Sequence, residues 1–134
     1  DPDRGQSSSL RRGITATPAE IRWFVVHPVD MPLIGQRDYD ACFAALLQAS
    51  RIDQDAIVVA SHTMRRGHPL MLPRSVADEM VRGPDEISPR DVLKSRASHI
   101  VHVALVNPWV VDDLDFPADY DRAIESLEQR KPRL

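Results

Sequence analysis

Carboxylates that directly follow apolar runs are the residues of this sequence whose types and positions best suit chemistry. The first is Asp30, which lies between Pro28 and Pro32, shortly after the apolar run at 23–26. Because the two prolines restrict the backbone and stop any regular element, we expect Asp30 at the carboxyl end of a central strand. Such a carboxylate can bind a divalent cation that carries a phosphate, or it can cap an Asx-type turn. The local pattern leaves both interpretations open.

The second acidic position is a cluster of three carboxylates, Asp112, Asp113 and Asp115. Mg²⁺ prefers hard oxygen ligands and commonly takes one or two carboxylates together with phosphate and water. If the strand before Asp30 and the strand before the cluster are neighbours, these carboxylates meet at one edge of a sheet. The alternative is that the cluster only stabilises the N-terminus of the following helix through the helix dipole.

The other polar residues form no recognisable catalytic set. The five histidines lack the spacing of a zinc site, and no Gly-rich phosphate loop or Ser-His-Asp arrangement can be identified. His68 differs from the others because Gly67 and Pro69 flank it. This pattern is typical of a rigid loop that lets backbone approach a ligand, and equally of an ordinary tight turn. Arg65 and Arg66 beside it can pair with a phosphate or form a solvated loop.

The composition is that of one ordinary globular domain. The chain has 134 residues, of which 43% are apolar and 28% charged, enough for a single core. A net charge of −3 gives no general reason to expect nucleic acid or an anionic membrane as a partner. No apolar run approaches the roughly 20 residues that span a bilayer, and no signal peptide is visible. The single cysteine, Cys42, has no internal partner, so a reducing cytoplasm fits best.

The apolar pattern predicts strands that alternate with helices. Strands are expected at 23–26, 56–60, 70–72 and 99–106, and helices at about 38–50, 75–82, 88–95 and from Pro117 onward. Residues 61–69 are expected to form a polar loop, and a first short helix is expected to end at Gly13. The helix at 38–50 carries one apolar stripe expected to face a sheet: Tyr39, Cys42, Phe43, Leu46 and Leu47. Strands that are apolar on both faces indicate an α/β fold with a mainly parallel sheet.

Four short motifs follow one another along nearly the whole chain. They are residues 1–13, which contain Ser-Ser-Ser-Leu; 27–32, His-Pro-Val-Asp-Met-Pro; 66–70, Arg-Gly-His-Pro-Leu; and 113–120, Asp-Leu-Asp-Phe-Pro-Ala-Asp-Tyr. Their order and spacing resemble the MobA-like nucleotidyltransferases, most closely the molybdenum cofactor cytidylyltransferase branch. The resemblance implies a three-layer, Rossmann-like nucleotidyltransferase fold, with residues 1–134 in a single domain.

The resemblance also implies which residues hold the metal. Asp30 would be the first Mg²⁺ ligand and Asp115 the second, with Asp113 supporting it. Mg²⁺ would neutralise charge and position oxygens for in-line attack at the α-phosphate, without a protein nucleophile.

Two further segments receive roles from the same resemblance. Ser8, Ser9 and Leu10 would border the nucleotide base and ribose. The loop with Gly67 and His68 would face the acceptor.

The implied reaction joins a nucleoside monophosphate, from CTP or GTP, to a phosphorylated acceptor such as molybdopterin and releases pyrophosphate. One alternative is a non-catalytic nucleotide-binding or interaction module. Another is a relative of the sugar-phosphate nucleotidyltransferases, which would share the metal-binding acids and differ in the acceptor.

The chain departs from the family pattern in two places. Phe116 stands where the family has threonine, so a hydroxyl N-cap is lost and Asp115 becomes a candidate cap in competition with metal binding. The family's Gly-rich loop, whose Arg and Lys hold the triphosphate, has no counterpart before Asp1. We therefore expect the C-terminal two-thirds of such a domain, N-terminally truncated and inactive as an isolated fragment. An apolar sheet edge would then be open to self-association.

Overall fold

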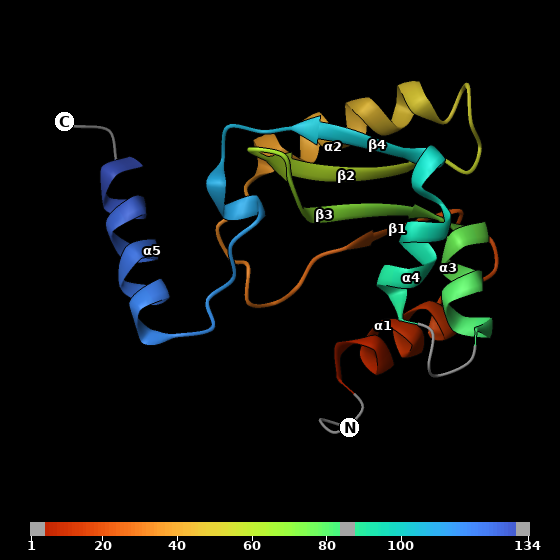
Figure 1. Cartoon of the computed structure of the whole chain (residues 1–134), viewed down its shortest axis with the longest axis horizontal. Helices are drawn as coiled ribbons and strands as arrows, with labels where there is room; N and C mark the ends of the chain where they lie inside the picture. Colours follow the sequence, from red (N-terminus) through yellow and green to blue (C-terminus); the bar gives the residue numbers. More distant parts are fainter. Residues whose placement is uncertain (1–4, 84–87, 131–134) are drawn as a thin grey trace.

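The computed structural model describes residues 5–83 and 88–130 (Figure 1). The elements follow one another as α1 (Gly5–Ala16), β1 (Trp23–Val26), α2 (Gln36–Ala49), β2 (Ile57–His62), β3 (Arg65–Pro73), α3 (Arg74–Arg82), α4 (Pro89–Ser95), η2 (Ala97–His99), β4 (Ile100–Ala104), η3 (Pro108–Val110) and α5 (Pro117–Arg130), where η marks a short 3-10 helix. None of the helices in these described ranges is long and apolar enough to cross a membrane.

The four strands form one mixed sheet in the order β1-β3-β2-β4. β2 and β4 pair in parallel, whereas β3 is antiparallel to both β1 and β2. β1, β2 and β4 therefore run in one direction and β3 alone reverses. The expected α/β class is confirmed. The prediction of a mainly parallel sheet is correct for the directions of the strands, since three of the four described strands run the same way. Of the neighbouring pairs only β2 and β4 are parallel, because β3 lies between β1 and β2.

The reversal is a β-hairpin that replaces the polar loop expected at 61–69. β2 continues to His62 and β3 begins at Arg65, so only Thr63 and Met64 remain for the turn. Both have positive φ angles, 46° and 67°, as the common two-residue hairpin turn requires. Neither is Gly, Asn or Asp, the residues that usually signal such a turn, and the sequence pattern therefore concealed it.

Helices cover both faces of the sheet and give the expected three layers (Figure 1). Alternate residues of β2 point to opposite faces, and each set lies in its own core cluster. The cluster under α2 includes Cys42, Leu46, Val58, Ala60 and Met71. The cluster on the other face includes Ile57, Val59, Leu72, Val76 of α3 and Val92 of α4.

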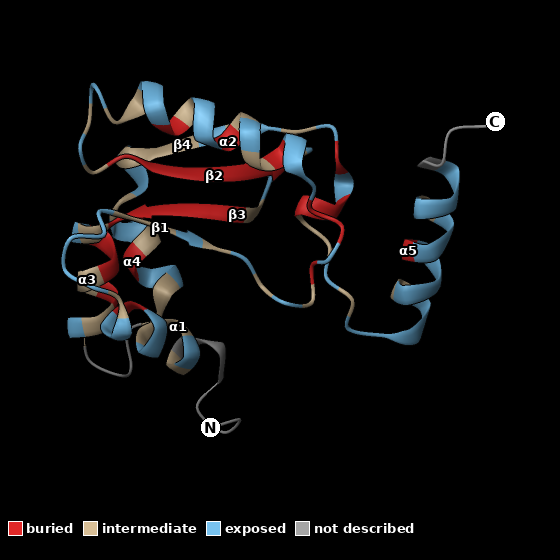
Figure 2. Cartoon of the chain, turned by 180° about the vertical axis from the view of Figure 1, so that it is seen from behind, coloured by how far each residue is buried: buried red, intermediate tan, exposed pale blue. Residues whose placement is uncertain are grey.

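Two helices differ from expectation in detail. α1 continues through Gly13 to Ala16 instead of ending at the glycine. The buried stripe of α2 is narrower than predicted, because Cys42 and Leu46 are 0% and 6% exposed whereas Phe43 and Leu47 are 44% and 65% exposed. α2 packs on the sheet along its Cys42–Leu46 line, and Figure 2 shows that much of its remaining surface is exposed.

α5 lies apart from the layered body, and Figure 2 shows most of its surface exposed. Its buried Ala123 joins Leu33 and Trp109 in a small apolar cluster. The Trp109 ring nitrogen also donates to the hydroxyl of Ser126 at 3.0 Å. α5 is therefore attached to the body through η3.

Candidate active site

The turn that presents Asp30 begins where β1 ends. The N–H of Met31 donates to the carbonyl of Pro28 at 3.3 Å and closes the turn. The residues that follow Asp30 anchor the chain after the turn, because Met31, Leu33 and Ile34 are buried. β1 has a described neighbour only in β3, so the strand before Asp30 is an edge strand of the described sheet and not the central strand that we expected.

The carboxylate of Asp30 has one oxygen in an unusual environment. Oδ1 is buried and has no hydrogen-bond partner among the described residues. A buried carboxylate oxygen without a partner is unfavourable, and a bound cation would relieve that cost. This oxygen is the observation in the structure that best fits the metal interpretation of Asp30.

The acidic segment reaches Asp30 by a route that we did not expect. β1 and β4 lie at opposite edges of the sheet, so the strands are not neighbours. After β4, however, the chain passes back across the end of the sheet through η3 (Figure 1). The N–H of Leu114 then donates to the carbonyl of Asp30 at 2.9 Å. The backbones of Asp30 and of the cluster are thus joined directly.

Gly67 of β3 allows η3 to pass close to the sheet. A Cβ atom on Gly67 would lie 1.7 Å from the carbonyl oxygen of Val110 in η3. No side chain fits at that distance, so the glycine serves the close approach of two backbone segments. The expected acceptor-side loop is instead part of strand β3.

Asn107, directly before η3, also holds this segment against the body of the domain, and the sequence analysis did not identify it. Its buried amide donates to the carbonyl of Leu33 at 3.0 Å and to Asp38 Oδ2 at 2.7 Å. Its Oδ1 accepts from the N–H of Trp109 at 3.3 Å. An Asn directly before a proline is a known turn signal and was available in the sequence.

The three acids of the cluster have different environments. Asp112 forms ion pairs with Arg65 at 3.3 Å and Arg122 at 3.9 Å, so its carboxylate links β3 to α5. Asp113 and Asp115 are exposed. No side-chain partner of Asp115 is found in the part of the chain that the structure describes.

Asp119, in the first turn of α5, binds the residue that precedes the helix. The N–H of Phe116 donates to Asp119 Oδ2 at 2.9 Å. The hydrogen bond from Arg122, followed by that from Phe116, holds the pKa of Asp119 below its usual value. Asp115 was a candidate N-cap of this helix, but among the described residues no hydrogen bond joins its carboxylate to the start of α5.

His68 lies on β3 beside the end of β1. Its Nδ1 donates to the carbonyl of Val26 at 3.1 Å. Burial lowers the pKa of His68 from its usual 6.5, and the nearby His27 acts in the same direction, while Val26 and Asp30 act in the opposite one. The ring is therefore neutral at pH 7, and Nε2 is its acceptor nitrogen.

Ser8, Ser9 and Leu10 belong to α1, on the face of the sheet opposite α2. The side chain of Leu10 packs against the core cluster of α3 and α4. Arg11 donates to the carbonyl of Gly83 at 2.9 Å and ties α1 to the end of α3. The structure thus accounts for Leu10 as a partly buried residue that packs against the core.

The described residues do not form a metal site from protein side chains alone. Among residues 5–83 and 88–130, no group of three or more His, Cys, Asp or Glu side chains is placed to hold a metal ion. Mg²⁺ in nucleotide-binding proteins often takes one or two carboxylates and completes its shell with phosphate and water. Asp30, with its buried Oδ1, suits that second arrangement as one carboxylate ligand.

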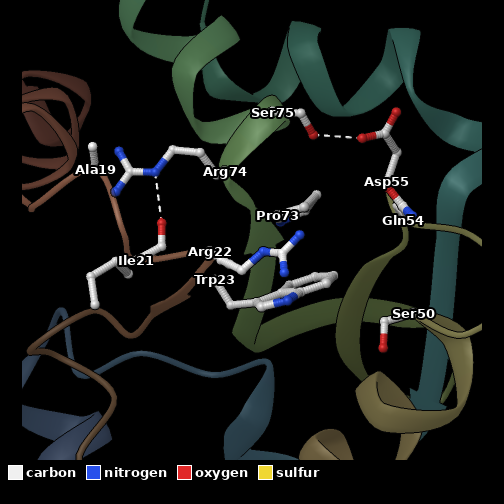
Figure 3. A pocket seen from close by; sticks show the side chains of 10 residues that line it. All are labelled: Ala19, Ile21, Arg22, Trp23, Ser50, Gln54, Asp55, Pro73, Arg74 and Ser75. Carbon is white, nitrogen blue, oxygen red and sulfur yellow. Dashed lines mark hydrogen bonds between the residues drawn. The ribbon is translucent and has the colours of Figure 1, made fainter.

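A surface pocket of about 560 Å³ lies at the opposite end of β1, near Trp23 and the start of α3 (Figure 3). Three of its polar side chains are engaged with protein: Ser75 donates to Asp55 at 2.5 Å, and the Arg74 guanidinium donates to the carbonyls of Ile21 and Pro18. None of the candidate metal-binding acids lines this pocket.

Comparison with known proteins establishes the family. The sequence profile of the MobA-like NTP transferase domain matches residues 1–101. The chain belongs to this family. The matched part of the MobA-like domain contains Asp30, Gly67 and His68, whereas Asp113 and Asp115 follow it. No curated protein matches the sequence of this domain.

Solved structures agree with the fold of this MobA-like domain. The Rv0371c homologue of Mycobacterium sp. strain JC1 aligns with a TM-score of 0.69 and 21% identity, over 95% of this chain and 61% of that one. Rv0371c of Mycobacterium tuberculosis H37Rv aligns with a TM-score of 0.65 and 22% identity, over 90% of this chain and 60% of that one. The domain thus spans about three fifths of the length of these structures.

Proposed function

We propose that this MobA-like domain takes part in Mg²⁺-dependent nucleotidyl transfer. In that reaction a nucleoside monophosphate passes from CTP or GTP to a phosphorylated acceptor such as molybdopterin, and pyrophosphate leaves. The observation that carries the proposal is the buried Oδ1 of Asp30, which has no hydrogen-bond partner among the described residues and lies in a turn whose backbone is bonded to the acidic segment. Family membership supports the same chemistry.

In this proposal Asp30 and Asp115 hold the Mg²⁺ ion, with Asp113 adding negative charge near Asp115. The ion, when bound, offsets the charge on the phosphates and orients their oxygens. Asp112 does not take part, because Arg65 and Arg122 engage its carboxylate.

The remaining roles concern the two substrates. We propose that Ser8, Ser9 and Leu10 border the base and ribose. For Leu10 this contact would come from the backbone, because its partly buried side chain packs against the core cluster. His68 would face the acceptor as a neutral ring, and Gly67 would act only by keeping η3 in place.

We also propose a reducing compartment, the cytoplasm, for this protein. Cys42 is a free thiol and 0% exposed. Burial, and then the nearby Asp38, raises the pKa of Cys42 to about 11. Such a thiol is inert and contributes as an apolar core residue.

Calorimetric titration of the chain with CTP and with GTP, each with and without Mg²⁺, tests the function. We expect Mg²⁺-dependent binding of one of the two nucleotides. Asp30→Ala should weaken that binding at least tenfold, about 1.4 kcal/mol, because a metal ligand is lost. The exposed Asp121 of α5 supplies the control variant Asp121→Ala, which should bind as the unchanged chain does.

The outcomes separate the candidate functions. Binding that persists in Asp30→Ala contradicts the metal assignment. Binding that needs no Mg²⁺ favours a non-catalytic nucleotide-binding module. No binding by the unchanged chain contradicts a nucleotide site within these residues.

A further inference from the structure

The turn that presents Asp30 is held at its carbonyl groups. Four carbonyl groups in or next to the turn accept hydrogen bonds. His68 Nδ1 donates to the carbonyl of Val26 at 3.1 Å, and His27 Nε2 donates to that of Met31 at 2.9 Å. The backbone N–H of Met31 donates to the carbonyl of Pro28 at 3.3 Å, and that of Leu114 donates to the carbonyl of Asp30 at 2.9 Å. Two of these donors are histidine side chains. His27 is the one within the turn itself.

Both ring nitrogens of His27 have partners. A carbonyl only accepts, so Nε2 must carry the hydrogen that it donates to Met31. In the neutral ring Nδ1 is then an acceptor, and it contacts the hydroxyl of Tyr39. The two ring centroids are 5.9 Å apart. Tyr39 belongs to the first turn of α2, so His27 connects the turn of Asp30 to that helix.

We propose that His27 is a positioning residue for Asp30. It does not touch the metal or the nucleotide. It donates a hydrogen bond to the carbonyl of Met31, the residue directly after Asp30. Through its contact with Tyr39 it also connects the turn to α2. The carboxylate of Asp30 is thereby kept in one place before any ligand arrives, which lowers the cost of ordering the site on binding. The inference rests on the proposed function, because Asp30 needs to be held in position only if it binds the metal ion.

The chemistry of this link requires a side chain that donates at one end and accepts at the other. Phenylalanine keeps the ring and loses both hydrogen bonds. Glutamine offers an amide N–H for Met31 and an amide oxygen for Tyr39, and it should replace the neutral histidine. Tyr39→Phe removes the same link from its other end and leaves the ring of residue 39 in place.

The first measurement is amide hydrogen exchange without metal, which reports on the turn whether or not the chain binds nucleotide. We expect His27→Phe to speed exchange of the Leu114 amide, which donates to Asp30, by roughly 3- to 10-fold. The amide of Val58 in β2 should be unchanged. Tyr39→Phe should act similarly, and the two changes together should not add. His27→Gln should restore slow exchange, and the control His102→Phe, at an exposed histidine of β4, should have no effect.

The second measurement is broadening by Mn²⁺ of the amide signals of residues 30, 31 and 114. We expect His27→Phe to need several times more Mn²⁺ than the unchanged chain, and His27→Gln to need about the same amount.

Two results would overturn the proposal. One is an unchanged Leu114 exchange rate in either His27→Phe or Tyr39→Phe, each of which tests the link on its own if the other variant fails to fold. The other is an equal acceleration at Leu114 and Val58, which would mean general destabilisation. If Leu114 alone responds but Mn²⁺ broadens no signal near Asp30 in the unchanged chain, the positioning role of His27 is supported and the proposed metal function fails.

Discussion

At the scale of single residues, Gly67 and Gly13 are a matched pair of glycines in different surroundings. A Cβ on Gly67 would lie 1.7 Å from the Val110 carbonyl oxygen, whereas a Cβ on Gly13 in α1 would have nothing within 4 Å. Gly67→Ala should therefore lower the free energy of unfolding by at least about 1–3 kcal/mol, because η3 must move. Gly13→Ala should raise it by about 0.5–1 kcal/mol through helix propensity.

Urea unfolding of the two variants checks this prediction. Equal midpoints for Gly67→Ala and the unchanged chain would show that η3 does not need to cross β3 closely. A lower midpoint for Gly13→Ala would contradict the continuation of α1 through residue 13.

His68 predicts a dependence of stability on pH. Burial lowers its pKa in the folded chain below the usual 6.5, so between these two values the unfolded chain binds more protons. The contribution of His68 is therefore fully present above pH 6.5 and is lost as the pH falls through the folded pKa. Replacing His68 by Gln should flatten the decline of unfolding free energy below pH 6.5. His102→Gln, at an exposed site, should not, and an unaltered decline in His68→Gln would contradict burial as the cause.

At the scale of elements, α2 contributes its stability through a narrow face. Leu46 is 6% exposed and packs against the sheet, while the adjacent Leu47 is 65% exposed. We expect Leu46→Ala to cost about 2–5 kcal/mol and Leu47→Ala much less. Thermal unfolding of both variants measures the difference. Similar losses would mean that α2 lies on the sheet in a different rotation.

At the scale of the whole molecule, β1 is an edge strand of the described sheet. It pairs only with β3 within the described sheet, and its Val25 side chain is 42% exposed. Edge strands with apolar side chains tend to pair with other chains, so we propose that this chain self-associates through β1. Sedimentation should show oligomers that increase with concentration.

Val25→Lys should reduce this association, because a charge on an edge strand opposes pairing. Val29→Lys, at a loop residue that is 98% exposed, is the matched control and should associate as before. A monomer at every concentration would contradict an accessible edge.

Much of the local structure was predictable from the sequence. The helices α2, α3 and α4 and the strand β2 lie close to the expected ranges, because apolar period and capping residues are local signals. Ser88 illustrates such a local signal: its hydroxyl accepts from the N–H of Asp91 and caps α4, with a proline at the first helical position. The α/β class and the three layers follow from the same patterns.

The tertiary structure alone decided which distant residues meet. Thr63 and Met64 turn the chain without a turn signal, so the hairpin that inserts β3 beside β1 was not predictable. The acidic segment reaches Asp30 from the far edge of the sheet, because Gly67 lets η3 cross and Leu114 bonds to the turn. The sequence by itself determined where α2, α3, α4 and β2 form and which acids follow apolar runs, since those depend on neighbouring residues. The path of the chain between β4 and α5 determined that those acids lie together, since it depends on contacts between residues far apart in the sequence.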